Sequence, residues 1–166
     1  EKMKASVYIL TCLLLMIIES AMFLVFPVEF FKPDIGLPFI IYTTIFLGPE
    51  TGLVATLVIS LFQEILSNAP QGSIIFTKTC AFILLILLRG KVFIDSKYSF
   101  SYICGGYVLF ESILFIIFSL LSRGELKNAI NVLVYIIPNS VFTGFVSIFI
   151  FVLIEYLNKR FLQREY

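Results

Sequence analysis

Apolar residues occur along this chain in long runs, separated by short polar segments with glycine, proline or charged residues. A helix that crosses a bilayer needs about 20 mostly apolar residues, with a range of about 17–25. Six runs approach or reach this length, and we expect each to form a membrane-spanning helix. No long linker separates them, so the pattern predicts a single domain, residues 1–166. The six predicted spans are residues 5–26, 33–47, 51–67, 73–88, 98–121 and 129–158.

The second run is short for a complete crossing. As a helix, residues 35–47 would extend about 20 Å, against a hydrocarbon core about 30 Å thick. We expect this run to cross by thinning the bilayer locally or by packing against its neighbours. The alternative is a re-entrant hairpin with the third run, turning at residues 48–52, which would need to be buried in protein or to face water. Both arrangements bring the chain back to the same side at Asn68.

Composition also indicates a membrane protein. Hydrophobic residues make up 60% of the chain and charged residues 14%, with a mean hydropathy of +1.03. Soluble domains carry about 45–50% apolar and about 25% charged residues. A small domain has too much surface for its volume to hide this apolar excess from water. The bilayer is therefore the expected solvent of this chain.

Basic residues predict the orientation. Three segments that six spans would place on one side hold eight of the twelve basic residues, and such segments face the cytoplasm. Both termini are therefore predicted to be cytoplasmic. The first run continues to Phe26 without a small-residue cleavage site, so we expect a retained span rather than a signal peptide. The eight residues are Lys2, Lys4, Arg89, Lys91, Lys97, Lys159, Arg160 and Arg164.

Several kinds of chemistry find no support in the sequence. There is no histidine, the commonest general base and metal ligand. Cys12, Cys80 and Cys104 lie far apart inside apolar runs, without the spacing of a zinc or redox site. The net charge of +1 gives no basic patch for nucleic acid. We expect no enzymatic activity, no cofactor and no metal.

A few polar residues lie inside the apolar runs, where an unpaired charge is costly. Glu64 and Lys78 flank the tight connection between the third and fourth spans, so we expect them to form an ion pair at similar depth. The alternative places both at the outer interface, with Lys78 extending toward the headgroups. Glu19 and Glu111 have no obvious basic partner. They are expected to form hydrogen bonds between helices, although a proton path would also use such groups.

Glycine and proline mark the expected turns and bends. Gly48, Gly52 and Gly72 permit tight turns or close helix contacts. Pro138, which precedes Asn139, is expected to kink the sixth helix because it removes one backbone hydrogen bond.

The segment from Lys32 to Gly72 resembles the signature region of the rod shape-determining protein MreD family. The shared features are a Lys32-Pro33-Asp34 entrance, a glycine-bounded break, an acidic residue (Glu64), Ser67 and a closing glycine (Gly72). The sixth span is also similar in layout. The sequence departs from the family where Glu64 replaces the usual aspartate and Asn68 a common glycine. Asp to Glu keeps the charge but moves it outward by one methylene group.

The resemblance implies an all-α membrane protein, similar in fold to the substrate-binding subunits of energy-coupling-factor transporters. It implies a non-enzymatic scaffold in the bacterial cytoplasmic (inner) membrane, within the machinery of cell elongation and peptidoglycan synthesis. Its partners would be an MreC-like bitopic protein and, indirectly, an MreB-like filament and cell-wall synthases, and self-association is left open. The residues expected to bind partners or to form structural polar contacts are Pro33, Asp34, Gly48, Gly52, Glu64, Gly72, Lys78, Pro138 and Asn139.

Two other functions remain alternatives. A solute-binding subunit of an energy-coupling-factor type transporter would need a polar pocket near the outer face and an alanine-rich first span. Only Ala5 and Ala21 occur in that span, which argues against it. An intramembrane enzyme or ion carrier would use the acidic residues of the spans, but no nucleophile motif accompanies them.

Overall fold

The structure is a computed structural model that describes residues 2–25, 33–67, 71–91, 94–123 and 126–159. These residues form an all-helical protein with six α-helices and one short π-helical segment, η1, which continues α2. The elements are α1 (Lys2–Val25), α2 (Gly36–Tyr42), η1 (Thr43–Leu47), α3 (Pro49–Leu66), α4 (Ser73–Leu88), α5 (Lys97–Arg123) and α6 (Leu126–Leu157).

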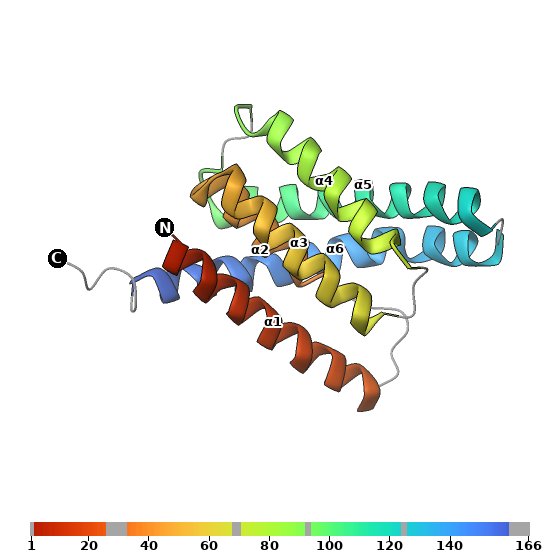
Figure 1. Ribbon diagram of the computed structural model, residues 1–166, viewed down its shortest axis with the longest axis horizontal. Helices are drawn as coiled ribbons and strands as arrows, with labels where there is room; N and C mark the ends of the chain where they lie inside the picture. Colours follow the sequence, from red (N-terminus) through yellow and green to blue (C-terminus); the bar gives the residue numbers. More distant parts are fainter. Residues whose placement is uncertain (1, 26–32, 68–70, 92–93, 124–125, 160–166) are drawn as a thin grey trace.

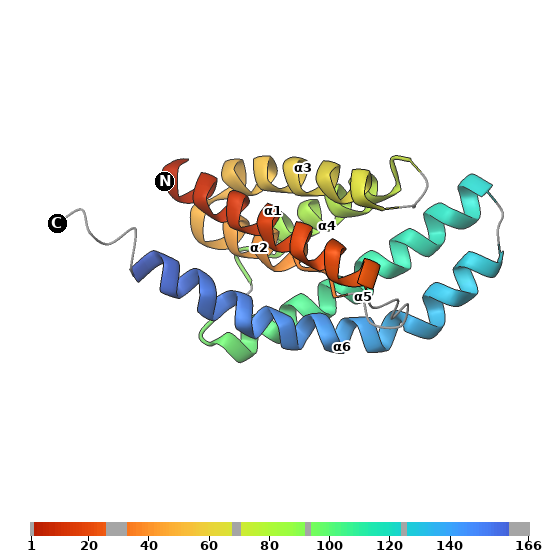
Figure 2. The ribbon, with the colours of Figure 1, turned by 90° about the horizontal axis from the view of Figure 1, so that it is seen from below.

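Consecutive helices run in opposite directions along the long axis of the molecule, with α2 and η1 acting as one rod (Figure 1). The start of α1 and the end of α6 therefore lie at the same end of the bundle. α5 and α6 lie side by side and extend beyond the other helices at the opposite end (Figure 2).

Within the described parts of the chain, three helical stretches are long and apolar enough to cross a membrane: Pro49–Leu66, Lys97–Phe118 and Leu133–Leu157. The shorter apolar helices cover Ser6–Ala21, Gly36–Leu47 and Ser73–Leu88. The six predicted spans are thus confirmed as helices, and six crossings with cytoplasmic termini stay a prediction. Large apolar side chains are exposed on several helices, as expected of a surface in contact with lipid. Examples are Leu14, Ile65, Leu87, Leu121 and Phe149.

The short helix α2 lies at the centre of the bundle. It contacts each of the other five α-helices, and all seven of its residues are buried. Around it, the apolar core includes Tyr8 of α1, Ile59 of α3, Leu85 of α4, Phe100 of α5 and Ile154 of α6. Because α2 is enclosed by protein, its shortness does not have to be matched by thinning of the surrounding lipid.

The turn between η1 and α3 is tighter than the predicted break at residues 48–52. Gly48 alone lies outside the helices, with φ +112°, a conformation that favours glycine. Pro49 opens α3, where its missing N–H costs nothing. Thr43 and Thr44 at the start of η1 are buried, and both hydroxyls donate to the carbonyl oxygen of Ile40, at 3.1 and 2.7 Å. The start of the irregular segment is therefore shielded by protein, as a bilayer requires, whereas Phe46 further along is exposed.

Two reciprocal hydrogen bonds join α5 to α6. The hydroxyl of Ser101 donates to the carbonyl oxygen of Gly144 at 2.6 Å, and that of Ser140 donates to Gly105 at 2.7 Å. Small residues allow two helices to approach closely enough for such bonds. Gly105 is thus a packing position, whereas a Cβ at Gly106 would meet open space.

Candidate functional site

Asp34 is the hub of a polar cluster at the end of the bundle where α1 and α3 end and α2 and α4 begin. One carboxylate oxygen, Oδ1, accepts hydrogen bonds from the N–H of Leu37 at 3.0 Å and from Nε2 of Gln63 at 2.9 Å. The Asp34 backbone N–H donates to the hydroxyl of Thr143 at 3.0 Å. A single residue before α2 therefore ties that helix to α3 and α6.

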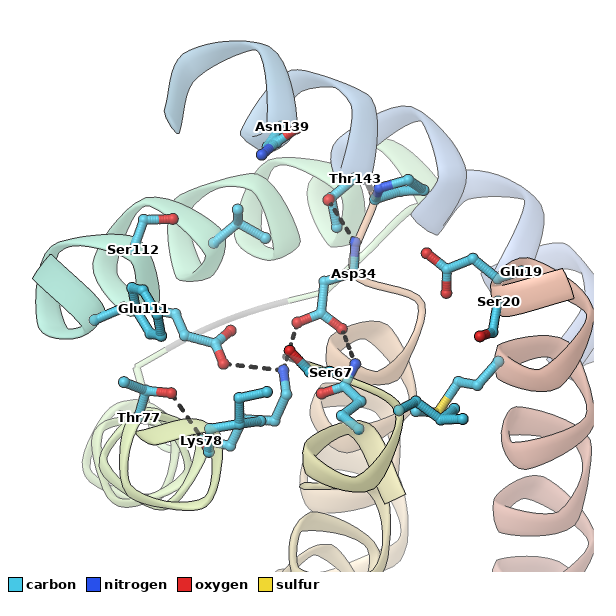
Figure 3. Close-up of a pocket in the computed structure, with 17 residues that line it drawn as sticks. Glu19, Ser20, Asp34, Ser67, Thr77, Lys78, Glu111, Ser112, Asn139 and Thr143 are labelled. Carbon is cyan, nitrogen blue, oxygen red and sulfur yellow. Dashed lines mark hydrogen bonds and ion pairs between the residues drawn. The ribbon is translucent and has the colours of Figure 1, made fainter. Parts of the chain in front are cut away.

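Lys78 of α4 completes the cluster. Its ammonium forms an ion pair with Oδ2 of Asp34 and a second one, 2.9 Å long, with Oε1 of Glu111 on α5. Lys78 is only 1% exposed, so its charge depends on these two carboxylates rather than on water. The triad of Asp34, Lys78 and Glu111 connects three parts of the fold that are distant in sequence: the entrance to α2, α4 and α5 (Figure 3).

The predicted ion pair between Glu64 and Lys78 is wrong, and so is the expectation that Glu111 lacks a basic partner. Glu64 instead accepts hydrogen bonds from the backbone N–H groups of Gly72 and, at 3.2 Å, of Ile75. These groups belong to the first turn of α4, where N–H groups have no partner within the helix and attract negative charge. Glu64 and Lys78 do lie near the same connection, but each has a different partner.

The glycines of the signature segment have two different roles. Gly72 precedes α4 with φ +84°, a left-handed conformation that other residues adopt only with strain. Gly52 lies in the first turn of α3, where an added Cβ would come within 2.8 Å of the Cα of Thr44 in η1. Of the predicted glycines, Gly48 and Gly72 thus serve turns, whereas Gly52 serves close packing.

Pro138 and Asn139 both lie within α6, which continues through the proline and is bowed along its length (Figure 2). Asn139 points toward the polar cluster (Figure 3). Its Oδ1 is buried and has no hydrogen-bond partner among the described residues. Pro33, at the entrance to α2, lies beside the same cluster.

A partly open cavity of about 270 Å³ adjoins the triad. Its polar lining combines residues from five helices with Asp34, and its remaining wall is largely apolar. The close-up shows Glu19 on the α1 side and Glu111 on the opposite side, with Asp34 between them (Figure 3). The principal polar lining residues are Glu19, Asp34, Gln63, Lys78, Glu111 and Asn139.

Sequence reasoning identified most of these residues but not their arrangement. Glu111 was recognised as a polar residue within a span, and Thr143 was not singled out. One signal was available: Lys78 is the only basic residue inside the six predicted spans, so each acidic residue at similar depth was a candidate partner. Asp34 was overlooked as that partner because it is 44 positions away along the chain.

The arrangement can hold charge and donate or accept hydrogen bonds within a protected space. Among the described residues, no group of three or more metal-ligating side chains could hold a metal ion. The chain matches no protein-family model, no curated protein and no solved structure.

Proposed function

We propose that this chain is a non-enzymatic membrane scaffold of the bacterial cell-elongation machinery, of the MreD type. It lies in the cytoplasmic membrane with six crossings and both termini in the cytoplasm. It binds an MreC-like bitopic protein, and through that protein it links an MreB-like filament to cell-wall synthases.

The observation that carries this proposal is the position of the signature residues. Asp34, Glu64 and Gly72 all lie at helix junctions, where they connect helices through hydrogen bonds and an ion pair. A motif that fixes the relative positions of helices suits a protein whose task is to present a constant shape to its partners. The same residues are those on which the family resemblance rests.

The projecting ends of α5 and α6 are the surface we assign to the bitopic partner. They extend beyond the other helices at the end opposite to the start of α1 (Figure 2). With cytoplasmic termini this end faces outward, toward the extracytoplasmic part of such a partner. Leu121, near the end of α5, is 83% exposed and provides an apolar contact there.

Affinity purification of the tagged chain from its native membranes in mild detergent, followed by mass spectrometry, tests the proposal. We expect a single-span protein with a coiled-coil extracytoplasmic region, together with cell-wall synthases. Depletion of the chain should make rod-shaped cells round. Recovery of a pair of ATPases with a second membrane subunit would instead identify a transporter.

A matched pair of variants tests the assigned surface. Leu121→Ala should reduce recovery of the bitopic partner, whereas Leu87→Ala should not. Leu87 is also highly exposed, at 70%, but lies near the end of α4, at the other end of the bundle. Equal recovery with both variants would show that α5 and α6 do not form the partner surface.

One observation favours the second candidate, a solute-binding membrane subunit. The cavity beside Asp34 has several polar lining residues and is partly open. Asp34 lies just before α2, at the end of the bundle opposite to the start of α1 (Figure 1). A transport subunit would need such a pocket near the outer face. Co-purification with ATPases would therefore support it over the scaffold.

A further inference from the structure

An open groove of about 570 Å³ runs between α5 and α6, and every residue that lines it belongs to one of these two helices. Three of the lining residues are glycines, which leave space because they have no side chain: Gly105, Gly106 and Gly144. Tyr102 and Phe145 also line the groove and are 82% and 61% exposed. The groove therefore opens to the surroundings of the bundle rather than to its core.

The groove does not require a polar occupant. The hydroxyls of Ser101 and Ser140 already donate to the carbonyl oxygens of Gly144 and Gly105, at 2.6 and 2.7 Å. The other lining side chains beyond the two tyrosines are apolar, so hydrocarbon can fill the groove without leaving these hydroxyls unpaired. These side chains are Leu109, Val141, Phe145 and Ile148.

The length of the groove matches one leaflet of a bilayer. On α5 it extends from Tyr98 to Leu109, about 16 Å at a rise of about 1.5 Å per residue. The apolar stretch that could cross a membrane, Lys97–Phe118, begins beside Tyr98. The hydrocarbon core is about 30 Å thick, so the groove reaches from the membrane surface to about its middle. A crossing helix of another protein would need contact over the whole thickness, whereas one acyl chain needs only half.

A positive charge lies at the membrane-surface end of the groove. Lys97 is exposed, and its ammonium is 5.3 Å from the centroid of the Tyr98 ring, which lines the groove. Tyrosine is enriched at the level of the lipid headgroups. Asp95, exposed two positions earlier, opposes further negative charge, so the phosphate common to all phospholipids is the group that Lys97 would pair with. A cation at one end and apolar surface along the rest complement a phosphate and its acyl chain.

We infer that this groove binds a phospholipid, with its phosphate on Lys97 and one acyl chain lying along Gly105 and Gly106. The chain gains close contact with the helix backbones, because the glycines carry no side chains. The inference rests on the membrane location proposed above and not on the scaffold role. It gives the outer face of α5 and α6 an occupant of its own, separate from the polar cavity beside Asp34.

Native mass spectrometry of the full chain, freed of lipid by washing in detergent, tests the inference. Dioleoyl phosphatidylglycerol is titrated against dioleoylglycerol, which has the same acyl chains but no phosphate. We expect a single phospholipid to bind saturably, and dioleoylglycerol to bind about tenfold more weakly or less, the effect of losing one charged hydrogen bond. Absence of a saturable first site, or equal affinity for the two lipids, would overturn the inference.

Gly106→Leu fills the groove without disturbing the packing of the protein. A Cβ at Gly106 meets open space, so the variant should fold and keep its melting temperature, while its affinity for phosphatidylglycerol should fall about tenfold or more. Gly90→Leu is the matched control, because a Cβ there also meets open space but Gly90 follows α4 and does not line the groove. Equal lipid affinity in the two variants would refute the assigned groove.

Lys97→Gln tests the phosphate contact. It should weaken the binding of phosphatidylglycerol until it equals that of dioleoylglycerol, whereas Lys91→Gln should change neither. Lys91 is an exposed basic residue just after α4 and outside the groove. A similar loss in both variants would show a general effect of positive charge and would refute the role of Lys97.

A second copy of the chain is the competing occupant, and light scattering of the detergent complex detects it. We expect the same mass for the chain before and after phosphatidylglycerol is added, and for Gly106→Leu. A dimer that Gly106→Leu converts to a monomer would overturn the lipid assignment. These measurements use the purified chain alone, so their failure leaves the recovery of scaffold partners from native membranes as a separate result.

Discussion

The ammonium of Lys78 lies 2.9 Å from the carboxylate of Glu111, and this ion pair joins α4 to α5 beneath the polar cavity. The same ammonium also pairs with Asp34, which in turn bonds to Gln63 and Thr143. The lysine is thus the one basic centre of a network that spans α3, α4, α5, α6 and the start of α2. Its loss should affect all of these contacts together.

Lys78→Met should strongly destabilise the protein. The substitution keeps an aliphatic chain of similar length but leaves the carboxylates of Asp34 and Glu111, whose side chains are only 21% and 14% exposed, without their counter-ion. Removal of one partner of a buried ion pair costs about 3–5 kcal/mol. The free energy of unfolding in mixed micelles measures this effect. The triple variant Lys78→Met, Asp34→Asn, Glu111→Gln leaves no unpaired charge at this site. It should therefore recover much of the unfolding free energy that Lys78→Met loses.

Lys91→Met is the control for that experiment. Lys91 lies just after α4 and is exposed, so its replacement should change the unfolding free energy by no more than about 0.5 kcal/mol. If Lys78→Met were as mild as Lys91→Met, the triad would not contribute to stability.

Glu64 and Lys78 should act independently. Glu64 bonds to the first turn of α4, and removal of such a capping group by Glu64→Ala should cost about 0.5–2 kcal/mol. In a double-mutant cycle, the effects of Glu64→Ala and Lys78→Met should add within about 0.5 kcal/mol. Lys78→Met and Glu111→Gln should instead couple by about 0.5–3 kcal/mol, because these residues are in contact. A large coupling energy between Glu64 and Lys78 would instead support the ion pair predicted from the sequence.

The positions of the helices could be predicted from the sequence, but the pairing of polar side chains could not. Ser73–Leu88 forms α4 within the predicted bounds, because uninterrupted apolar runs favour helices whatever surrounds them. The partner of Lys78 depends instead on which helices pack together and at what depth. The sequence suggested its neighbour across the short connection, Glu64, whereas packing brings Asp34 and Glu111 to it.

The central position of α2 could not be predicted from the sequence either. A short apolar run bounded by Pro33-Asp34 and Gly48 favours a crossing over a re-entrant hairpin, but it does not indicate how much of the run is enclosed by protein. The packing of five other helices around α2 shows that enclosure. The cavity likewise forms where side chains from distant segments meet, so no local sequence pattern predicts it.

Gly52→Ala should be much more damaging than Gly106→Ala. At Gly52 the new methyl group would come within 2.8 Å of the Cα of Thr44, so α3 and η1 would have to separate. Overpacking of this kind costs about 1–3 kcal/mol. At Gly106 the methyl group meets open space, and alanine in a helix is favoured over glycine by about 0.5–1 kcal/mol. Thermal unfolding of both variants in the same detergent tests this, and equal melting temperatures would contradict the close approach of α3 to η1.

The topology is tested by cysteine labelling in intact cells. Gln71 and Asp95 are both exposed, but Gln71 lies just before α4 and Asp95 just before α5, so one crossing separates them. If basic segments face the cytoplasm, Gln71→Cys should react with an impermeant thiol reagent from outside. Asp95→Cys should react only after the membrane is permeabilised. The native Cys12, Cys80 and Cys104 are first replaced by alanine, so that each signal comes from one site.

The reverse labelling pattern would mean that the protein has the opposite orientation in the membrane, with the mouth of the cavity on the cytoplasmic side. Labelling of both sites from outside would show that α4 does not cross.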